Sequence, residues 1–381
     1  MGNLALGVAI ARNSSALEFG SFAVSWAIYL LATGTIRAGV AESALAKGDL
    51  QSARHRVAGA FWVAMLLGAA VVSIGLLFEQ MFLFTVGCFL PALTVFEYVR
   101  VVEMALGRGR IALGMDSIWT LASVLILCAT IFCSIPSVLL FATWAAVPSV
   151  VVVILFVLFR GALTKVASLR PSFANVRLAF MADYLIGSGS MQVAISFLPV
   201  VASTAMVGAI RGAGTILSPI TLITSTMRPL LIASAGQLST SVSAPKVLLR
   251  RFTIVNLLLL LVSLPLVLAA ALLPDTIGNA LLGPSWPAAS TIIIPIGVES
   301  IGGLLAATAF AAHRVRDAAR RVLVVRSLLA MARVGSVLVT GALYGVVAVA
   351  WAMALVSVIG LIIWSCSYFQ LEASSQRRGR L

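Results

Sequence analysis

Hydroxyl and guanidinium side chains recur at helical spacing within the apolar stretch 205–232. They follow one another by three or four residues and so share one face of a helix: Arg211, Thr215, Ser218, Thr221, Ser225 and Arg228. A guanidinium group donates paired hydrogen bonds to phosphate or carboxylate oxygens. The stripe predicts an aqueous cavity lined by this face, and the alternative is a helix–helix interface held by hydroxyl groups. Pro219 and Pro229 should kink the helix.

The composition of the chain is that of a membrane protein. Of its 381 residues, 61% are hydrophobic and 10% are charged, whereas a soluble domain carries about 25% charged residues. Apolar runs of about 20 residues, each long enough as a helix to cross ~30 Å of hydrocarbon, recur along the chain. We count twelve and predict an all-α polytopic fold with spans near 1–12, 19–40, 57–78, 81–106, 111–134, 137–159, 178–201, 205–232, 251–273, 288–312, 321–343 and 345–368.

Positive charge is concentrated in alternate breaks between these segments. Six breaks hold most of the 26 Lys and Arg residues, and the breaks that alternate with them hold Arg12. Short loops rich in Lys and Arg remain cytoplasmic. We therefore expect both termini in the cytoplasm. The longest outer break is 274–287.

The basic break 160–177 divides six segments from six. It predicts a six-helix lobe at 1–159, a second at 178–370, and a basic cytoplasmic tail at 371–381. The stretches 15–20 and 204–208 occupy equivalent places in the two halves, as internal repeats do. The first segment is much shorter than its counterpart in the second half, which indicates either a short helix or an incorrectly assigned start codon.

Some ionisable residues fall deep within apolar segments. A charge at bilayer depth costs about 2.5–3.5 kcal/mol on insertion scales, so it usually faces water or a partner. Arg326 and Arg333 share a face of segment 321–343, and Arg333 is the deeper of the two. Glu299 lies near the middle of its segment, which makes it a candidate counter-ion or proton site.

Segment four carries Glu97, Arg100 and Glu103 at steps of three residues. These side chains can pair with one another, and ligand contact is the alternative. Asp116 and Asp183 lie near the inner ends of their helices and are expected at the membrane interface.

Enzyme and metal signatures are absent from the sequence. It contains no HExxH, no GxSxG, no P-loop and no Asp-rich diphosphate motif, and its four cysteines form no CxxC. We expect the cysteines to be small buried hydrophobes. The net charge of +14 lies mainly in membrane-flanking breaks, where it sets orientation and attracts anionic lipid rather than nucleic acid. The sequence thus predicts a transporter without a cofactor or a metal site.

The chain resembles the polysaccharide-transporter branch of the multidrug/oligosaccharidyl-lipid/polysaccharide (MOP) flippase superfamily, which is MATE-like. Three stretches of the sequence carry the likeness: Ala9-Ile10-Ala11-Arg12 with Glu18-Phe19-Gly20-Ser21-Phe22-Ala23, Met206-Val207-Gly208-Ala209-Ile210-Arg211-Gly212-Ala213 with Arg228-Pro229, and Leu273-Pro274-Asp275 with Leu281-Leu282-Gly283-Pro284-Ser285-Trp286-Pro287-Ala288-Ala289. The chain departs from the family in length, and the deficit falls in the first segment.

The resemblance implies two six-helix lobes around a central cavity with alternating access. It implies flipping of lipid-diphosphate-linked oligosaccharide from the cytoplasmic to the outer leaflet of the plasma (inner) membrane, for surface polysaccharide export. The expected partners are the lipid-linked sugar and membrane lipids, together with a polysaccharide polymerase and glycosyltransferases. Coupling would be to H⁺, to Na⁺ or to the membrane potential.

Combining this function with the residues gives a hypothesis for the site. Arg211 and Arg333 would contact the diphosphate, because guanidinium groups bind phosphate in a bidentate manner. Supporting contacts would come from Arg12, Arg100 and Arg228, with hydroxyl groups of Ser218 and Ser225. Counter-ions for the empty site would be Glu299, Asp183 and Glu97.

Other functions remain as alternatives. A cation-coupled multidrug exporter of the same superfamily would prefer an acidic cavity, whereas arginine predominates here within the membrane. A lipid II flippase usually has two more helices. A membrane polysaccharide polymerase or ligase generally has a large outer loop, and a structural scaffold would leave the deep arginines unexplained.

Overall fold

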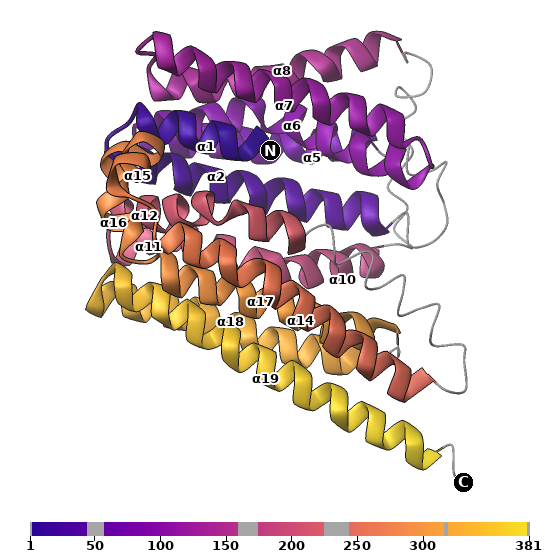
Figure 1. The fold of residues 1–381 in the computed structure, drawn as a ribbon. Helices are drawn as coiled ribbons and strands as arrows, with labels where there is room; N and C mark the ends of the chain where they lie inside the picture. Colours follow the sequence, from indigo (N-terminus) through magenta and orange to yellow (C-terminus); the bar gives the residue numbers. More distant parts are fainter. Residues whose placement is uncertain (1, 44–56, 159–173, 225–243, 316–318, 379–381) are drawn as a thin grey trace. The chain divides into compact units, whose positions relative to one another are not determined.

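The computed structural model describes residues 2–43, 57–158, 174–224, 244–315 and 319–378. These residues are helical and include no β-strand (Figure 1). Each of the twelve predicted segments overlaps described helical residues, and positions 225–232 of the eighth lie outside the described residues. Nine of the described helices are long and apolar enough to cross a membrane, or up to eleven if each of two bent helix pairs forms one span. The helix α1 (Gly2–Arg12) has 11 residues, fewer than the 18 that this test requires. The predicted all-α polytopic fold is confirmed.

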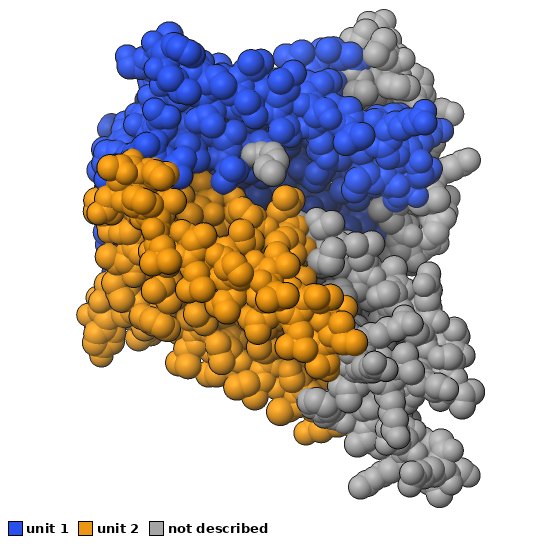
Figure 2. Space-filling view, in the orientation of Figure 1, with its two compact units in different colours: residues 1–208, 279–285 blue, residues 209–278, 286–381 orange. Residues whose placement is uncertain are grey.

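Contacts divide the chain into two compact units, which Figure 2 shows in separate colours. Unit 1 comprises residues 1–208 and 279–285, and unit 2 comprises residues 209–278 and 286–381. This grouping by contacts extends unit 1 beyond the expected first lobe. The division into two repeated lobes stays a prediction.

Unit 1 is built from helices that pack on α2 and α6. After α1, its elements are α2 (Ala16–Ile36), the π-helix η1 (Arg37–Glu42), α5 (Val57–Leu77), α6 (Met81–Ala105), α7 (Gly109–Phe132), α8 (Ser137–Leu158), α10 (Ala174–Tyr184), the π-helix η3 (Leu185–Gly189), α11 (Ser190–Val201) and the first turn of α12 (Thr204–Ile216).

A capping box fixes the start of α2. The Ser15 hydroxyl accepts a hydrogen bond from the Glu18 amide at 3.3 Å, and the Glu18 carboxylate accepts one from the Ser15 amide at 3.0 Å. These bonds satisfy two amide groups that the first helical turn would otherwise leave without partners. The box sets the direction in which α2 leaves the break after α1.

The beginnings of α2 and α12 touch at two glycines. A Cβ atom on Gly20 would overlap the carbonyl oxygen of Thr204, and one on Gly208 would lie 3.0 Å from the Gly20 amide nitrogen. The two glycines come from the stretches that occupy equivalent places in the two halves of the sequence.

Replacing Gly20 by Ala is therefore expected to destabilise the protein by about 1–3 kcal/mol, because the backbones of α2 and α12 must move apart. Gly114→Ala is the matched control, since a Cβ at Gly114 meets no atom within 4 Å. Thermal unfolding of the purified protein in detergent should give a lower midpoint for the Gly20 variant than for the control. Equal midpoints would contradict the close approach.

Aromatic side chains from α2, α6 and α8 form a buried cluster in the core of unit 1. The ring of Phe22 lies 5.8 Å from Phe82 and 5.4 Å from Phe141, and Trp26 lies 5.2 Å from Trp144, measured between ring centroids. All five side chains are buried. Each such aromatic pair contributes about 0.5–1.5 kcal/mol beyond its buried area. The cluster holds these three helices together.

The described part of unit 2 contains four long helices and the short helices near residues 275–290. Its elements are the rest of α12, α14 (Ala244–Ala271), α15 (Asp275–Leu282, shared with unit 1), α16 (Trp286–Ser290), α17 (Ile293–Val315), α18 (Ala319–Tyr344) and α19 (Val346–Arg378). The helix α17 packs against α14 and α19, and α18 packs mainly against α19.

Two of the spans are sharply bent. The helix pair 204–216 and 218–224 changes direction by 66°, next to Pro219, so the kink predicted there is confirmed, while Pro229 lies outside the described residues. The pair 275–290 and 293–309 is bent by 89°.

Residues 274–287 were predicted to form an outer break, but this region is helical. The Trp286 indole donates a hydrogen bond to the Asp275 carboxylate there at 2.8 Å.

Large apolar side chains cover much of the surface. Leu66 is 75% exposed, Leu272 is 79% exposed and Phe132 is 84% exposed. A water-soluble monomer rarely shows large contiguous apolar patches, whereas lipid solvates such side chains. Together with the apolar spans, this surface makes the chain a multi-pass membrane protein.

The prediction that the cysteines are buried is wrong. The four side chains lie on the exposed surface of their helices: Cys88, Cys128, Cys133 and Cys366. The reason is that an apolar residue in a membrane helix is equally stable against lipid and against another helix.

Candidate functional site

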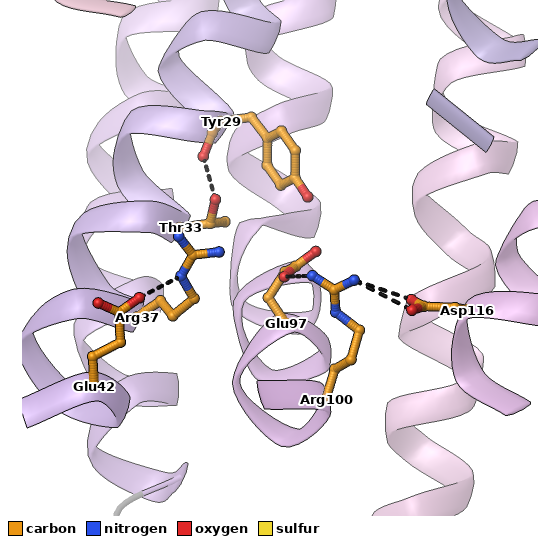
Figure 3. A network of polar contacts seen from close by, with 7 residues as sticks. All are labelled: Tyr29, Thr33, Arg37, Glu42, Glu97, Arg100 and Asp116. Atoms are coloured by element: carbon orange, nitrogen blue, oxygen red, sulfur yellow. Dashed lines mark hydrogen bonds and ion pairs between the residues drawn. The ribbon is translucent and has the colours of Figure 1, made fainter. Parts of the chain in front are cut away.

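Unit 1 contains a network of charged and phenolic side chains near one end of α2, α6 and α7 (Figure 3). Arg100 of α6 lies between two carboxylates. Its Nη2 donates to Glu97 Oε2 at 2.7 Å, and its Nη1 lies 3.3 Å from each carboxylate oxygen of Asp116 on α7. Because two carboxylates share one guanidinium group, these three residues carry one net negative charge when all are ionised.

The pairing expected within segment four is present in part, while ligand contact stays a prediction. Arg100 pairs with Glu97, as predicted, while Glu103 lies 3.8 Å from Arg108. Asp116 was expected only at the interface, and it is instead the second partner of Arg100. The Nε atom of Arg100 is buried and has no hydrogen-bond partner. The protein's own carboxylates thus occupy the other guanidinium nitrogens.

A second ion pair in unit 1 depends on the π-helix η1. Arg37 Nε lies 3.2 Å from Glu42 Oε1, although the two residues are five positions apart. In an α-helix such residues point about 140° away from one another. The wider turn of a π-helix, with its bonds between residues five apart, brings them together. The sequence analysis missed this pair because nothing in the local sequence distinguishes a π-helix from an α-helix.

Tyr184 joins α10 to α2 beside this ion pair. Its hydroxyl group donates a hydrogen bond to the Leu30 carbonyl at 2.8 Å. Its ring lies against Gly34, where any Cβ atom would overlap the ring. Two helices far apart in the sequence are thereby held at the level of the charged residues of unit 1.

An ion pair joins two apolar helices in the described part of unit 2. Arg333, near the middle of α18, places Nη2 3.7 Å from Glu299 Oε1 on α17. The side chains are 24% and 21% exposed. On the neighbouring helix α19, the Ser357 hydroxyl donates to the backbone carbonyl of Glu299 at 2.8 Å. Two of the predicted site residues, one basic and one acidic, are therefore brought together where three helices meet.

The charges inside unit 2 are unevenly balanced. Across the apolar parts of α14, α17, α18 and α19 (residues 253–271, 293–309, 321–344 and 346–368), Glu299 is the only acidic residue. Arginine occurs there at Arg321, Arg326 and Arg333. Unit 1, in contrast, combines its deep arginines with several carboxylates. Positive charge therefore exceeds negative charge within the described spans of unit 2.

The other predicted site residues have varied surroundings. Arg211 is half-buried on α12, and its backbone carbonyl accepts a hydrogen bond from the buried Thr215 hydroxyl. Ser218 is half-buried beyond the bend, so the predicted stripe does not follow one straight helix. Arg12 is exposed at the end of α1, and Asp183 is half-buried on α10. Two further predicted residues lie outside the described residues: Ser225 and Arg228.

No cluster of three or more potential metal ligands occurs among the residues that the structure describes. No protein-family model matches the sequence, and no curated protein matches it.

Solved structures do match the fold. An inward-facing multidrug resistance MATE family transporter of the MOP superfamily superposes with a TM-score of 0.73 at 12% identity, covering 99% of this chain and 95% of that chain. The lipid II flippase MurJ in an inward closed conformation gives 0.70 at 10% identity, with 96% and 85% covered.

A third similar structure is a MOP superfamily transporter from Pyrococcus furiosus. It gives a TM-score of 0.62 at 12% identity, covering 98% of this chain and 92% of that chain, and the reverse polarity of its binding pocket suggests a different function for it. Identities this low establish the fold alone. The chain is thus a multi-pass membrane protein with the fold of MOP superfamily transporters.

Proposed function

We propose that this protein is a flippase that moves lipid-diphosphate-linked oligosaccharide from the cytoplasmic to the outer leaflet of the plasma membrane by alternating access. Its orientation would place the basic breaks and both termini in the cytoplasm. A polymerase and glycosyltransferases would act on the same lipid-linked sugar. The protein would itself be a transporter and not an enzyme.

The observation that carries this proposal is the excess of arginine within the spans of unit 2. A disubstituted diphosphate has about two negative charges, and moving them through lipid without compensation is prohibitive. Arg333 and Arg211 are guanidinium groups within membrane helices, and such groups bind phosphate oxygens in a bidentate manner. The fold is also that of a lipid II flippase, among other transporters.

The membrane potential could drive the movement. An inside-negative potential favours outward movement of an anion by about 2.3 kcal/mol per charge per 100 mV. Two charges moving together would therefore gain several kcal/mol without nucleotide hydrolysis. This gain in free energy does not require coupling to protons or sodium ions.

A cation-coupled multidrug exporter is the second candidate, and unit 1 supplies the observation that favours it. The group formed by Glu97, Arg100 and Asp116 has an excess of one carboxylate, which would suit a cation. A MATE transporter is among the similar structures. The two candidates differ in the charge of the substrate, and the proteins with this fold include one with a binding pocket of reverse polarity.

Depletion of the protein in its native cells separates the candidates. We expect lipid-linked sugar to accumulate in the cytoplasmic leaflet and surface polysaccharide to be lost, as measured by leaflet-selective labelling of the precursor. Accumulation in the outer leaflet would instead indicate a polymerase or ligase acting after flipping. Unchanged precursor together with greater sensitivity to cationic drugs would favour the exporter and refute the flippase.

A further inference from the structure

The ion pair between Arg333 and Glu299 is loose. Its shortest distance is 3.7 Å, whereas charge-assisted hydrogen bonds span about 2.7–2.9 Å. The comparable bond between Arg100 and Glu97 is 2.7 Å. The Nε atom of Arg333 is buried and has no hydrogen-bond partner. Arg333 therefore keeps unused donor capacity while its charge is balanced by a partner that holds it weakly.

Within the described apolar parts of α14, α17, α18 and α19, Glu299 is the one acidic residue, and it lies next to Arg333. The helices packed on α17 contribute no other carboxylate in their described apolar parts, and their charged members there are Arg321, Arg326 and Arg333. The polar contact from α19 is the Ser357 hydroxyl, and it goes to the backbone carbonyl of Glu299. Ser357 therefore contacts the backbone of Glu299, whereas the carboxylate contacts Arg333.

A transporter that moves an anion must also return empty. With substrate bound, the anion would compensate the guanidinium group of Arg333. Once the substrate has left, an uncompensated charge at this depth would oppose the return step. A carboxylate next to the guanidinium can take the place of the absent anion and remove that barrier.

We propose that Glu299 is the stand-in anion of the empty protein: substrate displaces it from Arg333, and it rebinds Arg333 when the substrate leaves so that the protein can return. This inference rests on the proposed function, because it requires an anionic substrate. It assigns the two residues different roles. Arg333 is needed in every step that carries substrate, and Glu299 is needed in the empty return.

These roles can be separated by comparing exchange with net transport. In exchange, substrate is present on both sides and the protein never returns empty. In net transport, every cycle includes an empty return. We expect Glu299→Gln to leave exchange within about twofold of the wild-type rate and to slow net transport by about tenfold or more, because the charge of Arg333 then lacks a partner.

The test uses the full-length protein in vesicles of phosphatidylethanolamine and phosphatidylglycerol. The probe is radiolabelled N-acetylglucosamine linked through diphosphate to citronellol, whose short lipid tail keeps it soluble. Exchange is its uptake into vesicles loaded with the unlabelled probe, and net transport is its uptake into empty vesicles. Glu79→Gln is the matched control, because it removes an exposed carboxylate at the break between α5 and α6.

Each outcome has a defined meaning. Preserved exchange with slowed net transport in Glu299→Gln, and normal behaviour in Glu79→Gln, would support the inference. Equal loss of exchange and net transport, or no loss of either, in a protein that elutes as a single species would overturn the inference while leaving the proposed flippase function intact.

If Glu299→Gln fails to fold, Glu299→Asp keeps the negative charge and should retain net transport. Loss of net transport in that variant would also overturn the inference. Absence of exchange by the wild-type protein would overturn the inference and the proposed function together.

Discussion

Replacing Arg100 by Gln is expected to destabilise unit 1 more than any other single change in its charged network. The substitution leaves Glu97 and Asp116 facing one another without the guanidinium group that now lies within 3.3 Å of both. Breaking a fully buried pair costs about 3–5 kcal/mol. Since Asp116 is 39% exposed, we expect a smaller loss of about 2–3 kcal/mol.

Neutralising the carboxylates tests the cause of this loss. The triple variant Arg100→Gln, Glu97→Gln and Asp116→Asn removes all three charges and should recover most of the stability, because no unpaired charge remains. Thermal unfolding in detergent measures both variants. Similar midpoints for the single and triple variants would mean that the shape of the arginine side chain, rather than its charge, holds α6 and α7 together.

Hydropathy located most of the described helices. Each predicted segment overlaps described helical residues because a membrane span must be both apolar and long enough to cross the bilayer. The bend beside Pro219 was predictable for a similarly local reason, since proline cannot donate a backbone hydrogen bond. The helices at 275–290 were not predicted, because their polar and turn-forming residues also suit a loop.

The contacts between side chains were harder to predict from the sequence. The pair formed by Glu97 and Arg100 follows from helical spacing, whereas Asp116 reaches Arg100 only through the packing of α6 on α7. The pair of Arg37 and Glu42 requires a π-helix. Arg333 and Glu299 were each predicted to be site residues because they lie deep in a span. Their pairing, however, depends on how α17 and α18 approach one another.

Loss of Arg333 is expected to abolish flipping without unfolding the protein, provided that Glu299 is neutralised at the same time. The double variant Arg333→Gln and Glu299→Gln removes the ion pair as a unit, so no unpaired charge is left within the membrane. It also removes one guanidinium group that would bind the diphosphate. A hydrogen-bonded charge is worth about 1.5–3 kcal/mol, so we expect transport of the lipid-linked probe to fall by roughly a hundredfold in both exchange and net modes.

Arg211→Ala should have a comparable effect if both arginines contact the diphosphate, whereas Arg110→Ala, at the exposed start of α7, should transport normally. All the variants must elute as single species with unfolding midpoints close to that of the wild type.

Transport of a cationic dye by the same vesicles provides the opposing test. If the double variant loses probe transport and gains dye transport, the arginine excess of unit 2 sets the charge of the substrate. Full probe transport by both the double variant and Arg211→Ala would remove the basis for an anionic substrate.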